Sequence, residues 1–335
     1  MTAVDVVVVE HGHRATLAAV LQGLVDQRHP PHGVVAVHNA PTAASLALSH
    51  GFVGRLPLTV VISPENRGFS AAFNDGLRRS TAPWVLSLNP DCRLESDFLA
   101  ELVAAAERVP AVGAASGLLL RARGDALEPT EVVDSAGMIV TSGGRHLDRG
   151  SGRRVAPEHG RPALVFGVSG AAALYRREAL DDVAYPDGEV FDERFFAYRE
   201  DADLAWRLQR RGWSCLYWPR ARAWHARGLK PEAARRGSLE INRLSVRNRF
   251  LLRLANADWR WHLACFPAWL IRDLAVVAAC LTIERASLPG LAEAWRWRHQ
   301  QRARGRWNRE RSKVSGWRVA RWFLPGGRLR EVASP

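Results

Sequence analysis

The chain has 335 residues, of which 47% are hydrophobic, so it is long enough for one large domain or for a domain with an extension. Its net charge of +13 arises from residues 229–335, which hold 22 basic and 8 acidic side chains, against 25 and 26 in residues 1–228. The four cysteines form no CxxC pair, which excludes a structural zinc site of that type and suits a reducing compartment.

The first 108 residues are expected to alternate between strands and helices. The run Val4–Val9 is β-branched, which is typical of a strand covered on both faces. This segment lacks the basic start of a signal peptide, so we expect a cytoplasmic protein. Further strands are expected at 34–37, 58–62 and 84–88, and helices at 15–27, 43–50, 69–79 and 97–108. This order predicts a mostly parallel α/β sheet that binds ligands at the carboxyl ends of its strands.

From residue 113 the alternation is weaker. Strands are expected in "VGAASGLLL" and "VVDSAGMIV". The Gly-, Arg- and Pro-rich segment 141–162 is expected to be a mobile loop. The segment 164–180 indicates a strand, a turn of small residues, a second strand and the start of a helix. A helix beginning at Glu200 and a strand followed by a turn complete this part of the chain.

The last third predicts a helical extension, residues 229–335, beyond a domain that covers residues 1–228. It holds eight of the 13 tryptophans, many of them next to arginine, and this pairing suits the headgroup layer of an anionic membrane. The apolar segment 263–283 has Arg272 and Asp273 near its centre, where each charge costs ~2.5–3.5 kcal/mol in a bilayer. We therefore expect a buried or interfacial helix rather than a span. The alternative is a helical subdomain that packs on the core with a solvated basic face.

The first motif that indicates chemistry is "SPENRGFSAAFNDGL", residues 63–77. A glycine such as Gly68 lets the backbone approach a ligand closely, and Asn66 and Asn74 can hydrogen-bond a base or a ribose. The same residue types also form ordinary turns and helix caps.

The second motif is "LSLNPDCRL", where a hydrophobic strand runs into Asn89 and Asp91. A carboxylate at a strand end can hold Mg²⁺ or Mn²⁺ together with phosphate oxygens of a substrate. The alternative is an Asx turn that closes the strand.

The third motif is "FFAYREDADLAWRLQRRGW", which places Glu200, Asp201 and Asp203 in the first turn of a helix. Three acidic groups there complement the helix dipole, and this structural effect alone could explain the cluster. Carboxylates next to aromatic rings cost solvation energy unless their charge is used, so the other reading is catalysis. His225, expected on a loop in "WPRARAWHARG", is either a metal ligand or a polar surface histidine.

Taken together, the order and spacing of these motifs resemble the inverting family 2 glycosyltransferases of the GT-A fold. The similarity is strongest to the bacterial branch of rhamnosyltransferases and galactofuranosyltransferases. In that branch an Asn/Gly motif precedes an "NPD" variant of the DxD metal motif. A stretch like "F-D-E-x-F-F-x-Y-x-E-D-x-D-L-x-x-R-L" then precedes a "P-x-A-x-x-x-H" ending, and the resemblance covers residues 4–228.

The resemblance implies a GT-A domain, a divalent metal ion and a nucleotide-diphosphate sugar donor. It implies that Asp91 and His225 hold Mg²⁺ or Mn²⁺ and that Asp201 is the general base, with Glu200 and Asp203 positioning it or contacting the acceptor. The side chains implied to contact the nucleotide sugar are Asn39, Asn66, Gly68, Asn74, Asn89 and Asp91. A base of this kind contributes about 10²–10⁴ in rate, and its clustering with other acids beside aromatic rings is expected to raise its pKa.

The chain departs from the family pattern at its second strand, which usually ends in an acidic pair that contacts the nucleobase. Here His38 and Asn39 stand there, with Asn39 as the expected substitute, and Glu10 begins the sequence "EHGH" in place of the commoner "T-Y-N". These departures leave an alternative open: a catalytically impaired homologue that acts as a scaffold in polysaccharide assembly.

The expected activity is transfer of a hexosyl group from dTDP-rhamnose or a UDP-sugar to a lipid-linked or cell-envelope glycan acceptor. The basic, Trp-rich extension is expected to hold the protein as a peripheral component at the inner face of the plasma membrane. A nucleic-acid partner is not expected, because the basic region carries no RNA-binding motif.

Overall fold

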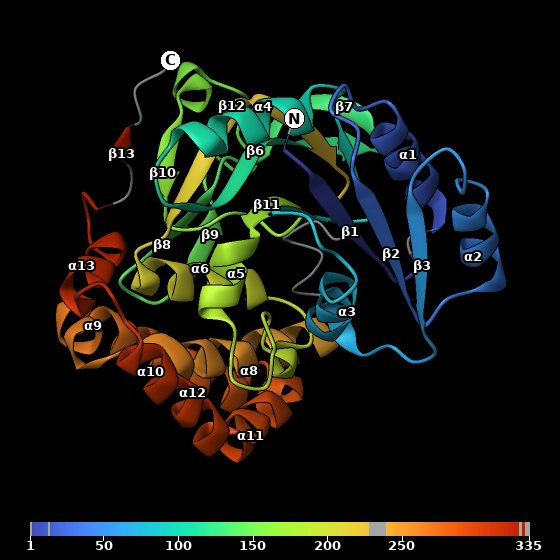
Figure 1. The fold of residues 1–335 in the computed structure, drawn as a ribbon. Coiled ribbons are helices and arrows are strands. Elements are labelled where there is room, and N and C mark those ends of the chain that lie inside the picture. The colour runs from blue at the N-terminus through green and yellow to red at the C-terminus, as the bar shows by residue number, and fades with distance from the viewer. Residues whose placement is uncertain (1, 13, 228–238, 328–329, 332–335) are drawn as a thin grey trace.

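The computed structural model describes residues 2–12, 14–227, 239–327 and 330–331. A mixed sheet runs through the molecule in the order β13-β10-β12-β6-β11-β4-β1-β2-β3, with β5 beside β12 and β7 beside β6 (Figure 1). Its first four strands, β1 (Val4–Glu10), β2 (Gly33–Asn39), β3 (Leu58–Ser63) and β4 (Trp84–Leu88), are parallel. Their carboxyl ends therefore meet at one edge of the sheet, as the alternating pattern predicts.

The other strands extend the sheet beyond β4. They are β5 (Cys92–Leu94), β6 (Val112–Arg123), β7 (Glu128–Ser135), β10 (Ala163–Val165), β11 (Ala172–Arg176), β12 (Ser214–His225) and β13 (Arg330–Glu331). β11 is antiparallel to both β4 and β6, whereas β12 is parallel to β6. The expected mostly parallel GT-A sheet is therefore present, with antiparallel strands in its second half.

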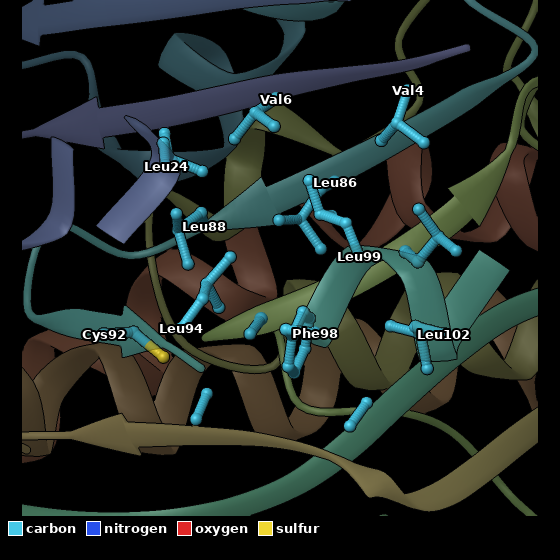
Figure 2. Packing of buried hydrophobic residues seen from close by; sticks show 14 of the residues in the cluster. Val4, Val6, Leu24, Leu86, Leu88, Cys92, Leu94, Phe98, Leu99 and Leu102 are labelled. Atoms are coloured by element: carbon cyan, nitrogen blue, oxygen red, sulfur yellow. The ribbon is translucent and has the colours of Figure 1, made fainter. Parts of the chain in front are cut away.

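Helices cover both faces of this sheet. On one face α1 (Arg14–Val25) and α4 (Phe98–Arg108) pack on β1 and β4, and α2 (Ala43–His50) lies at the β2–β3 end (Figures 1 and 2). On the other face lie α3 (Gly68–Leu77), α5 (Arg177–Val183) and α6 (Glu200–Arg211). Every residue of β1 is buried, because a strand covered on both faces loses water from all its side chains.

The prediction of a mobile loop at 141–162 is wrong. The segment contains β9 (His146–Asp148), which pairs with β8 (Met138–Val140), and a short 3₁₀ helix at Pro157–Gly160. It also hydrogen-bonds β7 through the backbone, with Gly152 N donating to Val133 O at 2.9 Å. Three of its glycines, Gly144, Gly150 and Gly152, have positive φ, as residues in tight turns do, so they serve bends within an ordered segment. A bend with such a glycine, Gly137, also divides "VVDSAGMIV" into β7 and β8.

The last third forms helices that lie together beside α5 and α6 (Figure 1). They are α8 (Leu239–Asn256), α9 (Trp259–Ala264), α10 (Ala268–Thr282), α11 (Leu288–Arg296), α12 (Arg298–Glu310) and α13 (Gly316–Ala320). A third core joins them to the sheet domain: Trp206 of α6 lies 5.8 Å from Trp261 and 4.7 Å from Phe323 between ring centroids. The predicted boundary between 228 and 229 lies outside the described residues.

The apolar segment 263–283 is not one helix, because α9 ends at Ala264 and α10 begins at Ala268. Within the described part of the chain, no single helix has the length and apolar character needed to cross a membrane. α10 and the helix that follows it meet those criteria only as a pair bent by 110°.

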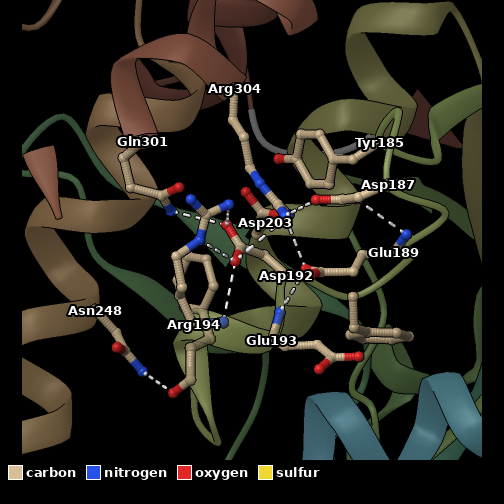
Figure 3. Close-up of polar contacts among 12 residues, drawn as sticks. Tyr185, Asp187, Glu189, Asp192, Glu193, Arg194, Asp203, Asn248, Gln301 and Arg304 are labelled. Atoms are coloured by element: carbon tan, nitrogen blue, oxygen red, sulfur yellow. Dashed lines mark hydrogen bonds and ion pairs between the residues drawn. The ribbon is translucent and has the colours of Figure 1, made fainter. Parts of the chain in front are cut away.

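A buried carboxylate, Asp192, connects the C-terminal helices to the sheet domain (Figure 3). Gln301 of α12 donates from Nε2 to Asp192 Oδ2 at 2.9 Å, and Arg194 donates from Nε to Oδ1 at 2.9 Å. Arg304 Nη1 lies 3.5 Å from Oδ1. Burial raises the pKa of Asp192, while Arg304 and Gln301 oppose that shift. A buried charge is stable only with such partners, so α12 is tied to this position.

Removing the amide of Gln301 tests this connection. Gln301→Ala leaves the buried carboxylate with one partner fewer, and we expect it to lower the free energy of unfolding by about 1–3 kcal/mol. The neighbouring exposed residue offers a matched control: Gln300→Ala should change it by less than about 0.5 kcal/mol. Urea unfolding of both variants makes the comparison, and equal effects would show that the Gln301 amide does not stabilise Asp192.

Candidate active site

The loop before α6 has a backbone that ordinary side chains rarely adopt. Phe196, Tyr198 and Arg199 have φ of 63°, 70° and 76°. Each non-glycine residue at such angles costs about 1–3 kcal/mol and persists only where its surroundings hold it. The loop also sets the direction in which α6 begins, so the positions of Glu200 and Asp201 depend on it.

Side chains of α8 hold this loop by its carbonyl groups. Asn248 Nδ2 lies 2.8 Å from the carbonyl oxygens of both Ala197 and Tyr198, and 2.9 Å from that of Phe195. Arg247 donates from Nη2 to the same Phe195 oxygen at 2.8 Å. Asn248 and Arg247 are both buried, so these bonds are protected from competition with water.

On its other side the loop contacts α3. Ser70 N donates to Phe196 O at 3.1 Å, and Gly68 has a φ of +81°. A Cβ at position 68 would lie 2.5 Å from the Phe196 carbonyl oxygen, so no residue with a side chain fits there. The predicted nucleotide-contacting glycine thus joins the donor-side turn to the loop before α6.

Glu200 and Asp201 begin α6 and are both partly buried. Burial and the neighbouring Asp201 raise the pKa of Glu200 to about 8. Burial and the Asp148 carboxylate raise the pKa of Asp201 to about 6. Burial and like charge thus make both carboxyl groups hold their protons more tightly than free carboxyl groups do.

Of the two roles predicted for Asp203, the structure does not fit contact with an acceptor. It is fully buried, pairs with Arg207 at 2.8 Å and accepts from Asn256 Nδ2 of α8 at 2.6 Å. Two residues along a helix turn the side chain by about 200°, so Asp203 points away from the face that carries Asp201. Asp203 therefore does not contact an acceptor; it attaches α8 to α6.

Asp91 and His225, far apart in sequence, lie together at the ends of β4 and β12. His225 Nε2 is 3.3 Å from Asp91 Oδ1 and 3.4 Å from the Asn89 side-chain nitrogen, and His225 Nδ1 is 2.9 Å from Asp134 Oδ2. Burial alone lowers the pKa of His225, but hydrogen bonds to Asp134 and Asp91 outweigh it and raise the pKa to about 9. His225 is the last residue of β12, not a loop residue as predicted, which explains its fixed orientation.

Two further charged residues, not found by the sequence analysis, connect this pair to α6. Arg227 lies 2.6 Å from Asp134 through Nε and forms a second ion pair with Asp148. Asp148 is in turn the carboxylate that raises the pKa of Asp201. Asp134 and Asp148 stand in β7 and β9, in segments without a recognisable motif, and only the pairing of strands brings them here.

A short backbone segment joins the two halves of the site directly. Gly170 N lies 3.5 Å from Asp201 Oδ2, and the next residue, Ala171, accepts at its carbonyl from Asn89 N at 2.9 Å. Asn89 is two residues before Asp91, so the α6 carboxylates and the Asp91–His225 pair flank one place at the sheet edge.

The side chains predicted to contact the nucleotide are mostly engaged with each other. Asn39 Nδ2 donates to Asn66 Oδ1 at 2.8 Å, and Asn39 Oδ1 accepts from Arg67 N at 2.9 Å. His11, which the sequence analysis did not single out as a contact residue, accepts at Nε2 from Nδ2 of the exposed Asn66 at 3.1 Å. His38 is fully buried between Glu10 and Ser49, so it faces away from any ligand.

Asn74 does not fit the role of a nucleotide contact. It is buried, its Nδ2 donates to Phe191 O at 2.8 Å and its Oδ1 accepts from Phe191 N at 3.0 Å. These bonds tie α3 to the segment before the acidic cluster. A helix-spaced asparagine next to glycine predicts a ligand contact and a structural bond equally well, which is why the sequence alone could not separate them.

The donor set at Asp91 and His225 is compatible with a divalent cation. His225 Nε2 and Asp91 Oδ1 face each other and are atom types that bind divalent cations, and Asp134 orients the ring from behind. Across the described ranges, no three His, Cys, Asp or Glu side chains form a complete metal cluster. Mg²⁺ and Mn²⁺ commonly use one or two protein ligands and complete their shell with water and substrate phosphate.

Solved structures identify the class of protein that this arrangement defines. A mannosyltransferase from Pyrobaculum calidifontis, solved with GDP-Man and Mn²⁺, aligns with a TM-score of 0.54 over 92% of this chain and 85% of its own, at 20% identity. Residues 1–349 of S. aureus TarS, solved in complex with UDP, align with a TM-score of 0.53 over 98% of this chain and 96% of that fragment, at 17% identity. The chain has the GT-A fold of glycosyltransferases.

The family follows from the sequence comparison. The model described as "Glycosyltransferase like family 2" matches residues 2–239, so the chain belongs to glycosyltransferase family 2. It is 32% identical over 154 residues to the N-acetylglucosaminyl-diphospho-decaprenol L-rhamnosyltransferase of Mycobacterium tuberculosis, covering 42% of this chain and 46% of that protein. It is 21% identical over 210 residues to a poly-beta-1,6-N-acetyl-D-glucosamine synthase of Staphylococcus epidermidis, covering 62% of this chain and 46% of that protein. The chain thus spans about half the length of the curated relatives it matches.

Truncating Asn248 tests the support of the loop before α6. In Asn248→Ala three carbonyl groups lose their shared donor, and we expect a loss of about 1–3 kcal/mol in the free energy of unfolding. The loop residues should also exchange their amide hydrogens faster, because less free energy then opposes their opening. Hydrogen exchange measured by mass spectrometry follows both effects. Glu240→Ala, on the exposed face of the same helix, is the control, and unchanged exchange at 195–199 in Asn248→Ala would contradict the assignment.

Proposed function

We propose that this protein is a metal-dependent, inverting glycosyltransferase that moves a hexosyl group from a nucleotide-diphosphate sugar to a hydroxyl group. The donor is dTDP-rhamnose or a UDP-sugar, and the acceptor is a lipid-linked or cell-envelope glycan. The observation that carries the proposal is the pairing, across Gly170 and Ala171, of the Asp201 carboxylate with the Asp91–His225 pair. Support for the acceptor class comes from the mycobacterial relative, which is named as an N-acetylglucosaminyl-diphospho-decaprenol L-rhamnosyltransferase.

The reaction needs a base on one side of the anomeric carbon and positive charge at the leaving diphosphate on the other. Asp201, in its ionised form, accepts the proton of the acceptor hydroxyl as that oxygen attacks the anomeric carbon. Glu200, whose pKa is also raised, is able to donate a hydrogen bond when it is protonated. When bound at Asp91 and His225, Mg²⁺ or Mn²⁺ supplies positive charge for the diphosphate. Attack opposite the leaving group inverts the anomeric configuration.

We also propose a peripheral position at the inner face of the plasma membrane. Support comes from apolar side chains that α9 and α10 leave in contact with solvent, among them Trp259, Leu263, Ile271 and Leu274. Such side chains beside arginines suit the interface of an anionic bilayer.

Replacing the base tests the mechanism. Asp201→Asn keeps the size of the side chain but cannot accept the proton, so transfer should fall by about 10²–10⁴ while nucleotide binding is retained. In the wild type, kcat/KM should decrease as the pH falls below about 6, because the raised pKa of Asp201 makes it protonate there.

The measurements are product formation by mass spectrometry across a panel of nucleotide sugars and calorimetry of nucleotide binding. Unchanged turnover in Asp201→Asn would refute the base assignment. A wild type that binds no nucleotide sugar, with or without Mn²⁺, would instead favour the scaffold alternative.

Metal dependence is tested at the Asp91–His225 pair. Chelation should abolish transfer, and added Mn²⁺ or Mg²⁺ should restore it. Asp91→Asn should lose this response. Asp134→Asn should weaken the apparent metal affinity by about 10–100-fold, because Asp134 orients His225 and is not itself a proposed metal ligand. The exposed carboxylate variant Asp97→Asn is the control. Full activity of Asp91→Asn in the presence of chelator would exclude a metal at this position.

A further inference from the structure

A cavity of about 550 Å³ lies between α8 and α10, beside the turn that precedes β9. It is separate from the Asp91–His225 pair and is bounded by Arg199, the residue directly before Glu200 and Asp201. It therefore lies behind the proposed base, on the side of the C-terminal helices. None of the reaction steps above uses it.

Four arginines line this cavity: Arg145, Arg199, Arg249 and Arg272. Three acidic side chains lie near them: Glu284 lines the cavity, Asp273 pairs with Arg249 at 2.9 Å but also with Arg253, and the charge of Asp201 acts on Arg199. The cavity thus holds more positive than negative charge. Asn242 and Ser245 of α8 add neutral hydrogen-bonding groups to the wall.

Two of these arginines, Arg199 and Arg272, have donors that can serve a ligand. Arg199 forms hydrogen bonds with neutral groups, His146 Nδ1 at 3.2 Å and Ser245 Oγ at 3.5 Å. Within the described ranges, the buried Nε of Arg272 has no hydrogen-bond partner. Burial and the neighbouring Arg249 and Arg145 lower the pKa of Arg199 to about 10, as expected where like charges crowd together out of water. A multivalent anion would relieve this repulsion.

Part of the cavity wall is apolar, and it continues onto an exposed apolar surface. Ala275, Val276 and Ala279 of α10 line the cavity. The adjoining side of the same helix exposes Ile271 by 62% and Leu274 by 61%. An anionic head placed among the arginines would therefore have an apolar path beside it, and this combination fits a phosphorylated lipid better than a water-soluble nucleotide.

We propose that this cavity binds the phosphoryl groups of a lipid-linked diphosphate acceptor, with the lipid chain along α10 and the acceptor sugar toward Asp201. The inference rests on the proposed function, because it assigns the acceptor side of the same reaction. The donor diphosphate belongs instead to the strand ends at Asp91 and His225.

The test uses the full chain and the variants Arg145→Gln and Arg272→Gln, alone and combined, with Arg302→Gln of α12 as an exposed control. Two acceptors carry the same sugar, one on a short-chain prenyl diphosphate and one on a neutral alkyl group. In the double variant the KM for the diphosphate acceptor should rise at least about tenfold, since charge-assisted bonds to phosphate are lost. The KM for the donor and for the alkyl glycoside should not change. Arg145 is exposed, so its single variant keeps the test valid if the double variant fails to fold.

Two binding measurements separate the possible sources of phosphate. Inorganic diphosphate, titrated without metal, should bind the wild type and the Arg302→Gln control but not the double variant. Equal losses with both acceptors, or no loss with either, would overturn the proposal. So would a double variant that loses only its sedimentation with vesicles containing anionic phospholipid, because the arginines would then serve bilayer headgroups.

The same measurements distinguish this inference from the proposed function. A wild type that binds inorganic diphosphate through these arginines, yet transfers sugar to neither acceptor from any nucleotide sugar, would refute the proposed function and support the phosphoryl site. A wild type that transfers sugar to both acceptors with equal KM would support the proposed function and refute the phosphoryl site.

Discussion

The site depends on hydrogen bonds between α8 and the carbonyl groups of the loop before α6. Three residues of that loop, Phe196, Tyr198 and Arg199, have positive φ. None of them is a glycine, so each raises the conformational free energy of the backbone. Asn248 and Arg247 offset the cost from one side, and the close approach of Gly68 does so from the other. The C-terminal helices therefore do more than extend the fold, because they determine where α6 begins.

The same dependence appears in the buried charges. Two acidic residues of the motif region have partners in the C-terminal helices. Asp192 accepts from Gln301 (Figure 3), and Asp203 accepts from Asn256. Of the three carboxylates at the start of α6, Asp203 holds the scaffold together, while Glu200 and Asp201 remain available for chemistry. One helical turn thus carries a structural role on one side and the proposed catalytic role on the other.

Local patterns were sufficient to predict most of the fold. The first four strands and α1 to α4 lie close to the expected ranges, because each is a hydrophobic run with its own period. The acidic cluster was correctly placed at the start of a helix. The structure also brings Asp91 and His225 together, while their metal role stays a prediction.

Other features could not be predicted from local sequence patterns, because they depend on residues far apart in the chain. The structural role of Asp203 requires Asn256, and the orientation of His225 requires Asp134 of a strand with no motif. The segment 141–162 looks like a loop by composition, but its glycines serve turns within an ordered hairpin. The arginine cavity arises only when α8 and α10 pack against the turn before β9.

The most direct test of the account is a double-mutant cycle between Asn248→Ala and Asp201→Asn, read as kcat for sugar transfer. If α8 acts by placing Asp201, Asn248→Ala should lower kcat in the wild-type background and have little further effect once Asp201 is replaced. Fully additive losses in the double variant would contradict the account, because the α8 contacts and the carboxylate would then act independently.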